Sequence, residues 1–372
     1  MYSTGIMKSI VKYNTLTLLL MEKLEKSING KNIKIYIGSG LENEINSSME
    51  KYMKNVSFVS YALKQLYKKK INAISSFKYF LRDGEASKST KYFNIIVRKL
   101  ISMEIERNNS ISYIGGGTLG DLIGYSASVY KRGIHLIGVP TTLLAQVDSS
   151  IGGKNAINFM NLKNAIGTFY NPDVVFDDVD FLVESDPTIL RDGIAEAIKM
   201  ALVRDGSFFD YFLRNNIDSV HNAESLEHII SRSVKIKLDV VSEDFYDTKK
   251  VRYLLNFGHS IGHALESYTG NRISHGTAVA NGMILESYIA YKSGFSQPFH
   301  DIIRTAVSAY GIPLIDFRDI ETDQLLSYIK NDKKVQGGKL NMVMLNGSGR
   351  AEIGEIEFSQ LRRYINIYRD NL

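Results

Sequence analysis

The sequence predicts a chain in two parts, an α/β half followed by a mainly α-helical half. Short apolar runs at 111–114 and 135–139 end in Gly or in Pro-Thr-Thr, with a helix-compatible segment between them, which is the rhythm of a parallel sheet with crossover helices. After Val174–Phe176 strand signals become rare, and residues 187–310 carry apolar side chains at i, i+3 and i+4. We therefore expect one domain over 1–176 and a second over 177–372.

The first half should open with two strands. Residues 32–38 alternate in polarity and end in Gly, and residues 55–60 are rich in strand-forming side chains. The basic run Lys68–Lys70 is expected to be a solvated helix end rather than a recognition patch. Because ligands of open parallel sheets bind at the carboxyl ends of the strands, the loops after 111–114 and 135–139 should carry a site.

Composition restricts the kind of protein and the chemistry. With 44% hydrophobic and 23% charged residues and only 5 Pro in 372 residues, the chain should be ordered and globular. The net charge of +5 arises from 45 basic and 40 acidic residues, too mixed for a nucleic-acid-binding surface but suited to small anionic ligands. Cys is absent, so any metal must be held by His and carboxylates.

The apolar stretch near the N-terminus does not predict a membrane segment. Leu18–Met21 is far shorter than the ~20 residues of a membrane span, and Glu22 and Lys23 follow it directly. No small-residue cleavage site follows, so a secretory signal is rejected as well. A cytoplasmic location without membrane contact is therefore expected.

Histidines gather in one part of the chain. Of seven His, His259, His263 and His275 fall within 17 positions. His259 and His263 are spaced i, i+4, which would place both imidazoles on one helical face, within reach of a cation or a polar substrate. The spacing alone is equally compatible with two buried histidines satisfied by hydrogen bonds.

A charged pair lies inside a predicted apolar helix upstream. Glu196 and Lys199 share one face of the segment 193–199. Two His and one Glu with an open fourth position form a recognised catalytic zinc set. A surface ion pair at i, i+3 is the competing interpretation.

A glycine-rich turn follows the predicted strand at 111–114. Gly115–Gly120 precedes a helix-like run, as a dinucleotide-binding turn requires. No acidic residue stands ~20 positions further on to bond a ribose, so an ordinary Rossmann domain is not expected. Asp121 could bond a ribose or nicotinamide group, or be a plain acid at a helix N-terminus.

Polar side chains cluster again around Gly152 and Gly153. Lysines beside paired glycines suit phosphate or carboxylate recognition, although ordinary exposed loop lysines would look the same. The residues concerned are Asp148, Lys154, Lys163 and Asn164.

Taken together, these motifs resemble in order and spacing the signature of the 3-dehydroquinate synthases over about residues 30–350. The segments that carry the resemblance are Gly115–Asp121, Arg132-Gly133, Val139–Lys154, Lys163-Asn164, Gly193–Lys199 and Leu255–Ala264. The resemblance implies a dehydroquinate synthase-like fold, with an α/β NAD-binding domain followed by a mainly α-helical metal-binding domain.

The resemblance also implies an activity and its cofactors. The expected reaction converts 3-deoxy-arabino-heptulosonate 7-phosphate into 3-dehydroquinate and phosphate, by transient oxidation with NAD, phosphate elimination, re-reduction and intramolecular aldol closure. The chain would be a lyase of the shikimate pathway that uses NAD and a divalent metal, zinc or cobalt. A homodimer is expected, because in this family Arg132 would reach the site of the other subunit.

The resemblance also implies which residues bind the metal, NAD and the substrate. The metal ligands would be Glu196, His259 and His275. NAD contacts would come from Asp83, Gly84, Glu85, Lys88, Gly117, Thr118, Leu119, Gly120, Asp121, Thr141, Thr142, Lys154, Lys163, Phe181, Leu182, Val183 and Glu184. The sugar-phosphate substrate would be held by Arg132, Asp148, Lys154, Asn164, Lys199, Lys237, Arg252, Asn256, His263 and Lys334, with Lys333 the alternative to Lys334.

The residues around 252–256 bear on the substrate. Arg252 and Asn256 agree with the dehydroquinate type, in which arginine suits a carboxylated substrate, whereas the deoxy-inosose type resembles Glu-Tyr-Gly-His there. Departures from the family pattern occur at Ser60-Tyr61, Asn155, Asp247–Arg252 and Thr277. Alternatives are an aminodehydroquinate-forming or 2-deoxy-scyllo-inosose-forming cyclase, a metal-dependent NAD polyol dehydrogenase, and a degenerate cyclase kept as a binding module.

Overall fold

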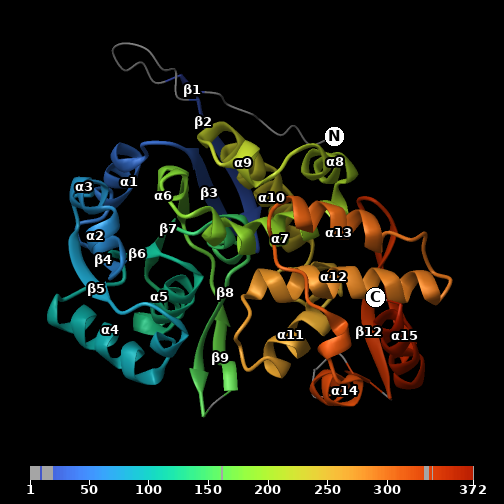
Figure 1. Ribbon diagram of the computed structural model, residues 1–372. Coiled ribbons are helices and arrows are strands. Elements are labelled where there is room, and N and C mark those ends of the chain that lie inside the picture. The colour runs from blue at the N-terminus through green and yellow to red at the C-terminus, as the bar shows by residue number, and fades with distance from the viewer. Residues whose placement is uncertain (1–8, 11–19, 161, 331–334, 337, 372) are drawn as a thin grey trace. The chain divides into compact units, whose positions relative to one another are not determined.

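Two compact units make up the chain in the computed structural model, which describes residues 9–10, 20–160, 162–330, 335–336 and 338–371 (Figure 1). The first unit holds the described residues up to Ser185 together with Asn222–Tyr246. The second holds Asp186–His221 and the described residues from Asp247 onward. The sequence assigns everything after residue 176 to the second half, yet helix α10 (Ala223–Glu243) packs with the first unit, because its apolar face lies on β2, β3 and η3.

The first unit is built on a sheet ordered β1-β2-β3-β10-β7-β6-β4-β5. From β3 to β5 neighbouring strands are parallel, whereas β1, β2 and β3 pair antiparallel. All residues of β6 are buried, and its side chains Ile111, Tyr113 and Ile114 belong to the apolar cores on the two faces of the sheet. The strands are β1 (Ser9–Ile10), β2 (Leu20–Ile28), β3 (Lys31–Gly38), β4 (Asn55–Ser60), β5 (Phe77–Leu81), β6 (Ser110–Gly115), β7 (His135–Pro140) and β10 (Val174–Asp178).

Helices cover both faces of this sheet. Phe58 and Val59 are neighbours on β4 but belong to different apolar cores, because successive strand residues point to opposite faces. One core takes in α4 (Thr90–Ser102) and α5 (Gly117–Val129). The other core takes in α1 (Glu42–Met49), α2 (Leu63–Leu66), α3 (Lys68–Ala73) and α6 (Asp180–Val183). The parallel α/β arrangement expected from the sequence is confirmed.

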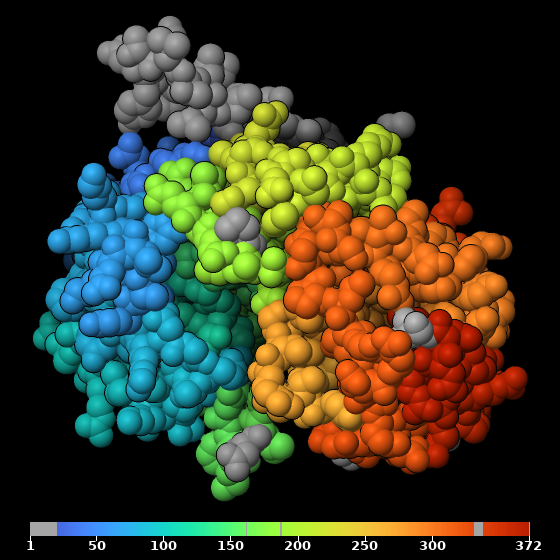
Figure 2. Space-filling view, viewed as in Figure 1, coloured from blue at the N-terminus to red at the C-terminus, as the bar shows by residue number. Residues whose placement is uncertain are grey.

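Shorter elements complete the first unit. The strands β8 (Lys154–Phe159) and β9 (Leu162–Phe169) form a separate two-stranded sheet, and their hairpin projects from the unit as the green protrusion of Figure 2. Exposed apolar side chains near its tip include Phe159 and Leu162. The short helical turns are η1 (Glu85–Ser87), η2 (Tyr130–Arg132) and η3 (Ala145–Ser149).

The second unit is mainly helical, as expected, around a buried central helix. In α12 (His275–Lys292) every residue from Gly276 to Ala290 is buried, and the helix packs on α7, α11, α13 and α15. The other helices are α7 (Pro187–Arg204), α8 (Gly206–Arg214), α9 (Ile217–Val220), η4 (Arg252–Asn256), α11 (His259–Tyr268), α13 (His300–Ala309), η5 (Phe317–Asp319), α14 (Thr322–Lys330) and α15 (Phe358–Asp370).

A small antiparallel sheet near the C-terminus was not anticipated from the sequence. It consists of β11 (Val335–Gln336), β12 (Lys339–Gly347) and β13 (Arg350–Glu357). Among the described residues, no helix is long and apolar enough to cross a membrane.

Candidate functional site

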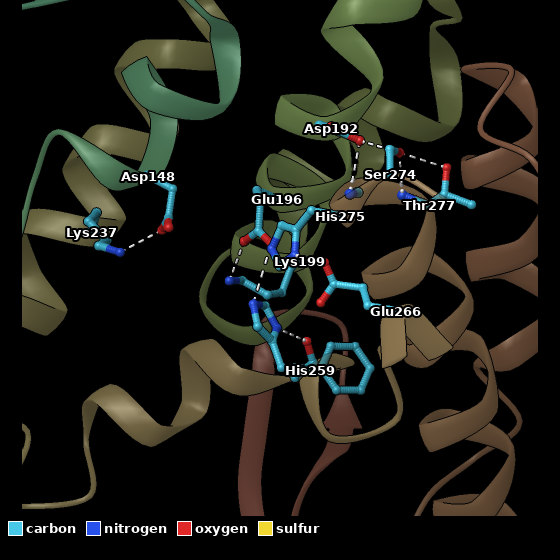
Figure 3. A network of polar contacts seen from close by, with 12 residues as sticks. Asp148, Asp192, Glu196, Lys199, Lys237, His259, Glu266, Ser274, His275 and Thr277 are labelled. Carbon is cyan, nitrogen blue, oxygen red and sulfur yellow. Dashed lines mark hydrogen bonds and ion pairs between the residues drawn. The ribbon is translucent and has the colours of Figure 1, made fainter. Parts of the chain in front are cut away.

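Three helices of the second unit each bring one side chain to a common point. Glu196 lies midway along α7, whereas His259 and His275 are the first residues of α11 and α12 (Figure 3). The backbones of α11 and α12 approach very closely, since a Cβ added to Gly282 would lie 2.0 Å from the carbonyl oxygen of Gly258. Gly258 also has a left-handed backbone, with φ of 77°, which favours glycine. These glycines bring the start of α11 against the middle of α12.

The donor atoms have the spacing of a metal site. Oε1 of Glu196 lies 3.5 Å from Nε2 of His259 and 3.3 Å from Nε2 of His275. Ligands about 2.0–2.1 Å from a tetrahedral zinc ion lie about 3.4 Å from each other. The three donor atoms lie within 4.8 Å of one another. This set therefore has the donors and the spacing that a tetrahedral metal ion requires.

Glu196 is unusual because it is buried without a hydrogen bond. Its side chain is 1% exposed, and neither carboxylate oxygen has a hydrogen-bond partner, although Lys199 forms an ion pair with it. A buried carboxylate without a hydrogen bond is energetically unfavourable unless it binds another group. The side chain of Lys199 is 2% exposed, so the surface ion pair considered from the sequence is wrong.

Charges in the site keep the carboxylate ionised. Burial alone would raise the pKa of Glu196, but Lys199, His259 and His275 hold that pKa well below its ordinary value. Burial, followed by the charge of Lys199, lowers the pKa of His259 well below its ordinary value. An anionic carboxylate beside a neutral imidazole is the state in which both groups can bind a metal.

The second nitrogen of each imidazole also has a contact. Nδ1 of His259 lies 3.1 Å from the carbonyl oxygen of Phe257. Nδ1 of His275 lies 3.4 Å from Oε1 of Glu266. Burial would lower the pKa of His275, but the neighbouring carboxylates of Glu196 and Glu266 raise it to about 10. Such contacts orient the rings that face a metal. No pattern in the sequence singled out Glu266.

His263 also belongs to this cluster. Its ring centroid lies 5.3 Å from that of His259 and 6.2 Å from that of His275. A second possible donor set combines His263, Glu266 and His275, but His263 is exposed. The buried carboxylate of Glu196 favours the first set as the metal site, and a substrate role for His263 stays a prediction.

The remaining substrate residues expected in the second unit lie in or beyond η4. Arg252 is buried, with 5% of its surface exposed, at the start of η4, and Asn256 ends that turn partly exposed. Lys333 and Lys334 lie outside the described residues.

In the first unit, the glycine-rich turn has the predicted setting. Gly116 ends the turn after β6, and α5 begins at Gly117. The N–H groups of Leu119 and Gly120 already donate to the carbonyl oxygen of Gly116, so those of Gly117 and Thr118 are left to meet a ligand. A Cβ at Gly117 would lie 2.5 Å from Oγ of Ser149, so no side chain fits there. Thr141 and Thr142 follow the neighbouring strand β7, and the N–H of Thr141 donates to the carbonyl oxygen of Gly115. The loops of both strands are therefore joined at one edge of the sheet.

Lys88 and Asp121 form a pair beside this turn. Nζ of Lys88 lies 2.6 Å from Oδ2 of Asp121 and also donates to Oδ1 of Asn164. Burial raises the pKa of Asp121 to about 6, although Lys88 acts to lower it. Glu85, three residues before Lys88, accepts a hydrogen bond from Asn158 of the hairpin.

Asp83 and Asp148 each have a partner inside the first unit. Asp83 accepts hydrogen bonds from the hydroxyl of Ser60 and, at 3.0 Å, from the N–H of Ala62. Lys237 on α10 donates to Oδ1 of Asp148 over 2.5 Å (Figure 3). Residues 148 and 237 are thus neighbours, as a shared substrate role would need.

The other expected contacts differ in exposure. Phe181 and Leu182 are each 1% exposed, so their side chains belong to the core and only their backbone could meet a cofactor. Val183 is half-buried and Glu184 exposed on the same turn. Exposed side chains belong to Arg132 in η2, Lys154 in β8, and Lys163 and Asn164 in β9. Gly84, with φ of 94°, leads into η1 and Glu85.

Comparison with known proteins gives consistent similarities. Residues 78–191 match the family model "3-dehydroquinate synthase N-terminal", and residues 193–335 match "3-dehydroquinate synthase C-terminal". A 3-dehydroquinate synthase of Picrophilus torridus is 49% identical over 299 residues, covering 80% of this chain and 86% of the relative. That of Thermoplasma volcanium is 42% identical, covering 87% and 91%.

Solved structures have the same fold. A 2-deoxy-scyllo-inosose synthase complexed with carbaglucose-6-phosphate, NAD+ and Co2+ superposes with a TM-score of 0.82 and 25% identity, covering 94% of this chain and 100% of that one. The 2-epi-5-epi-valiolone synthase ValA of Streptomyces hygroscopicus, with NAD+ and Zn2+ bound, gives 0.81 and 21%, covering 97% and 99%.

Proposed function

The chain belongs to the 3-dehydroquinate synthase family, and from this premise we propose how its own residues carry out the reaction. It is an NAD- and metal-dependent lyase that converts 3-deoxy-arabino-heptulosonate 7-phosphate into 3-dehydroquinate and phosphate. The observation that carries the proposal is the buried carboxylate of Glu196, which has no hydrogen bond and faces His259 and His275. When bound, NAD supplies a reversible hydride acceptor and the divalent metal a Lewis acid for a substrate oxygen.

The metal would be held by Glu196, His259 and His275, and zinc and cobalt both suit this donor set. Lys199 contributes through its charge. Its ammonium is buried against Glu196, and this keeps the carboxylate anionic in a setting where burial alone would protonate it. The same ammonium would offer a hydrogen-bond donor to a negatively charged substrate group.

NAD would be held by the elements that end the parallel strands. The first turn of α5 presents the backbone N–H groups of Gly117 and Thr118, which suit a pyrophosphate at a helix N-terminus. Thr141 and Thr142 line the adjacent strand end, and Asp121 would reach a ribose or nicotinamide group from beside Lys88. The other contacts proposed from the family pattern are Asp83, Gly84, Glu85, Lys154, Lys163, Phe181, Leu182, Val183 and Glu184.

The substrate carries a carboxylate and a phosphate, and the chain has cations to meet both. Arg252 would bind the carboxylate, because guanidinium matches it with two parallel hydrogen bonds. Lys237 and Asp148 form a donor and acceptor pair suited to substrate hydroxyls. Lys154, Asn164, Asn256, His263 and Lys334 would complete the set. With substrate held in this way, phosphate departure and the later aldol closure occur in an oriented, charge-neutralised site.

A homodimer in the cytoplasm is part of the same proposal. Arg132 is exposed on η2 and would complete the substrate site of the partner subunit. The measurement is the oligomeric state in solution, followed by mixing of an Arg132→Ala protein with a variant inactive at Glu196. Recovery of activity in the mixed dimer is expected, and a fully active monomer would contradict the dimer.

The experiment for the reaction combines the protein with NAD, zinc or cobalt, and 3-deoxy-arabino-heptulosonate 7-phosphate. Equal amounts of phosphate and 3-dehydroquinate are expected, without accumulation of NADH, because the hydride returns to the product. A folded, metal-loaded protein that releases neither product would reject the proposal. Glucose 6-phosphate, which lacks the carboxylate, serves as the control substrate and should not react.

A further inference from the structure

Each of the two histidines of the metal centre starts a helix, and a carboxylate from another helix of the centre holds that start. For α12, Oδ1 of Asp192 accepts a hydrogen bond of 2.9 Å from the N–H of Gly276 and one of 2.6 Å from the hydroxyl of Ser274 (Figure 3). These two residues flank His275. Asp192 precedes Glu196 by four residues on α7, so both carboxylates lie on the same face of one helix.

Helices α7 and α12 are in direct backbone contact at Gly276 and Asp192. A Cβ added to Gly276 would lie 2.3 Å from Cα of Asp192, so the two backbones touch. Ser274 additionally caps α12 by accepting from the N–H of Thr277 over 3.3 Å. The start of α12 is therefore tied to the helix that carries Glu196 by two hydrogen bonds to one oxygen.

A second carboxylate does the same for α11. Glu286 lies on α12 and is fully buried, with 0% exposure. Its Oε2 accepts a hydrogen bond of 2.7 Å from the N–H of Gly258, directly before His259, and its Oε1 accepts one of 3.3 Å from the N–H of Ile261. A negative charge at a helix N-terminus is stabilised by the helix dipole, which helps to offset its burial.

We propose that Asp192 and Glu286 are positioning residues of the metal centre. Asp192 sets the start of α12 relative to α7, and Glu286 sets the start of α11 relative to α12. The three ligands are thereby held in one arrangement, with both imidazoles facing Glu196 before an ion binds. The inference rests on the metal centre and is independent of which sugar phosphate the enzyme converts.

The helix cap of α8 offers a matched control. Asp205, also in the second unit, accepts from the N–H of Phe208 over 3.1 Å, but α8 carries no residue of the centre. Loss of this cap should lower stability by about 1 kcal/mol without changing the arrangement of the metal ligands. Asp192→Ala and Asp205→Ala thus remove the same kind of interaction at two different places.

The test measures zinc affinity by competition with a chelator, together with the visible absorption spectrum of the cobalt-loaded protein. For Asp192→Ala we expect a zinc affinity about 10- to 100-fold weaker and an altered cobalt spectrum. Asp192→Asn should bind zinc within about threefold of the original protein, because both hydrogen bonds use one oxygen that the amide retains. Asp205→Ala should leave affinity and spectrum unchanged.

Glu286→Gln should behave in the opposite way from Asp192→Asn. Both oxygens of Glu286 accept hydrogen bonds, so an amide would turn one acceptor into a donor facing an N–H group. A fall in zinc affinity of at least about 10-fold is therefore expected from this conservative change. Circular dichroism checks that the variant is folded. If it does not fold, Asp192→Ala, Asp192→Asn and Asp205→Ala test the inference without it.

The inference is overturned if folded Asp192→Ala or folded Glu286→Gln binds zinc like the original protein, or if Asp205→Ala loses affinity to the same extent. The reaction is tested separately. An original protein that binds zinc but releases no phosphate would reject the proposed reaction, and the pattern of zinc affinities would still test the positioning role.

Discussion

Nζ of Lys88 lies 2.6 Å from Oδ2 of Asp121, and the lysine side chain is only 4% exposed. The pair joins the segment after η1 to the first turn of α5, where the pyrophosphate of NAD is proposed to bind. Asp121 is therefore neutralised by a neighbour rather than being a free acid at a helix N-terminus. The pairing has a direct consequence for the cofactor.

Replacement of that lysine should weaken NAD binding and the fold together. In Lys88→Met, Asp121 loses its counter-charge and its pKa should rise further above the present value of about 6. We expect a dissociation constant for NAD at least ~10-fold higher by calorimetry, and a free energy of unfolding lower by about 3 kcal/mol. Lys91→Met, at an exposed position of α4 three residues further along the chain, is the control and should change neither quantity. Unaltered NAD binding in folded Lys88→Met would contradict the assignment.

The carboxylate of Glu196 should be essential for metal and dispensable for NAD. Glu196→Gln keeps the shape of the side chain but loses the charge, so zinc affinity should fall at least ~100-fold and turnover should disappear. NAD binding should be unchanged, because its proposed site lies in the first unit. Zinc at 100 times its dissociation constant should stabilise the original protein by about 2.7 kcal/mol, as measured by urea unfolding. Removal of zinc with a chelator should abolish this gain, and the variant should never show it.

A buried acid outside the proposed site predicts the pH dependence of stability. Asp177 on β10 is 0% exposed, neither of its oxygens has a hydrogen-bond partner, and burial raises its pKa well above the ordinary value. The folded protein therefore binds a proton that the unfolded chain releases above about pH 4. Its contribution to stability is present below that pH and is lost as the pH rises through the folded pKa.

The expected slope from Asp177 is up to about 1.4 kcal/mol per pH unit, measured by urea unfolding between pH 6 and 8. Burial raises the pKa of both Asp121 and Asp178 to about 6, so their contributions level off above that pH. Glu227, with a pKa raised by burial to about 7, and His275, with a pKa of about 10, add to the slope of Asp177 in this range. Asp177→Asn should therefore make the profile less steep between pH 6 and 8. An equally steep profile in the variant would show that another group is responsible.

Arg252 should decide whether a carboxylated substrate is accepted. Arg252→Gln removes the guanidinium, and we expect the KM for 3-deoxy-arabino-heptulosonate 7-phosphate to rise about 10- to 100-fold, as for the loss of a charge-assisted pair. Zinc and NAD affinities should stay within about twofold of the original, which separates substrate binding from damage to the fold. Arg350→Gln, at the exposed start of β13, is the matched control. Loss of zinc binding in Arg252→Gln would point to a structural role instead.

The pattern of the sequence predicted the sheet well because buried parallel strands carry apolar runs, as in Leu136–Val139 of β7. It could not separate a surface ion pair from a buried one. Glu196 and Lys199 have the same spacing in either case, and only the surrounding helices, distant in sequence, decide their burial. Glu286 could have been singled out by the signal that singled out Glu196, a carboxylate inside an otherwise apolar helix.

Lys70 is another residue whose surroundings the sequence pattern could not predict. The sequence predicted a solvated helix end at 68–70, and this is wrong for its last residue. Nζ of Lys70 lies 2.8 Å from carboxylate oxygens of Asp178 and of Asp180, and 2.9 Å from one of Glu42. These acids follow or end strands β3 and β10, so the neighbours of Lys70 come from more than 100 residues away along the chain as well as from α1. A local charge pattern contains no information about them.

The division of the chain has a consequence for biosynthesis. The backbone passes between the two units after Ser185, after His221 and after Tyr246, so the first unit is not one continuous stretch of polypeptide. A fragment ending at Ser185 would lack α10 and would leave Asp148 without Lys237. During translation the sheet therefore waits for residue 246 to leave the ribosome before its last helix can dock, by which time α7 to α9 of the other unit have already emerged.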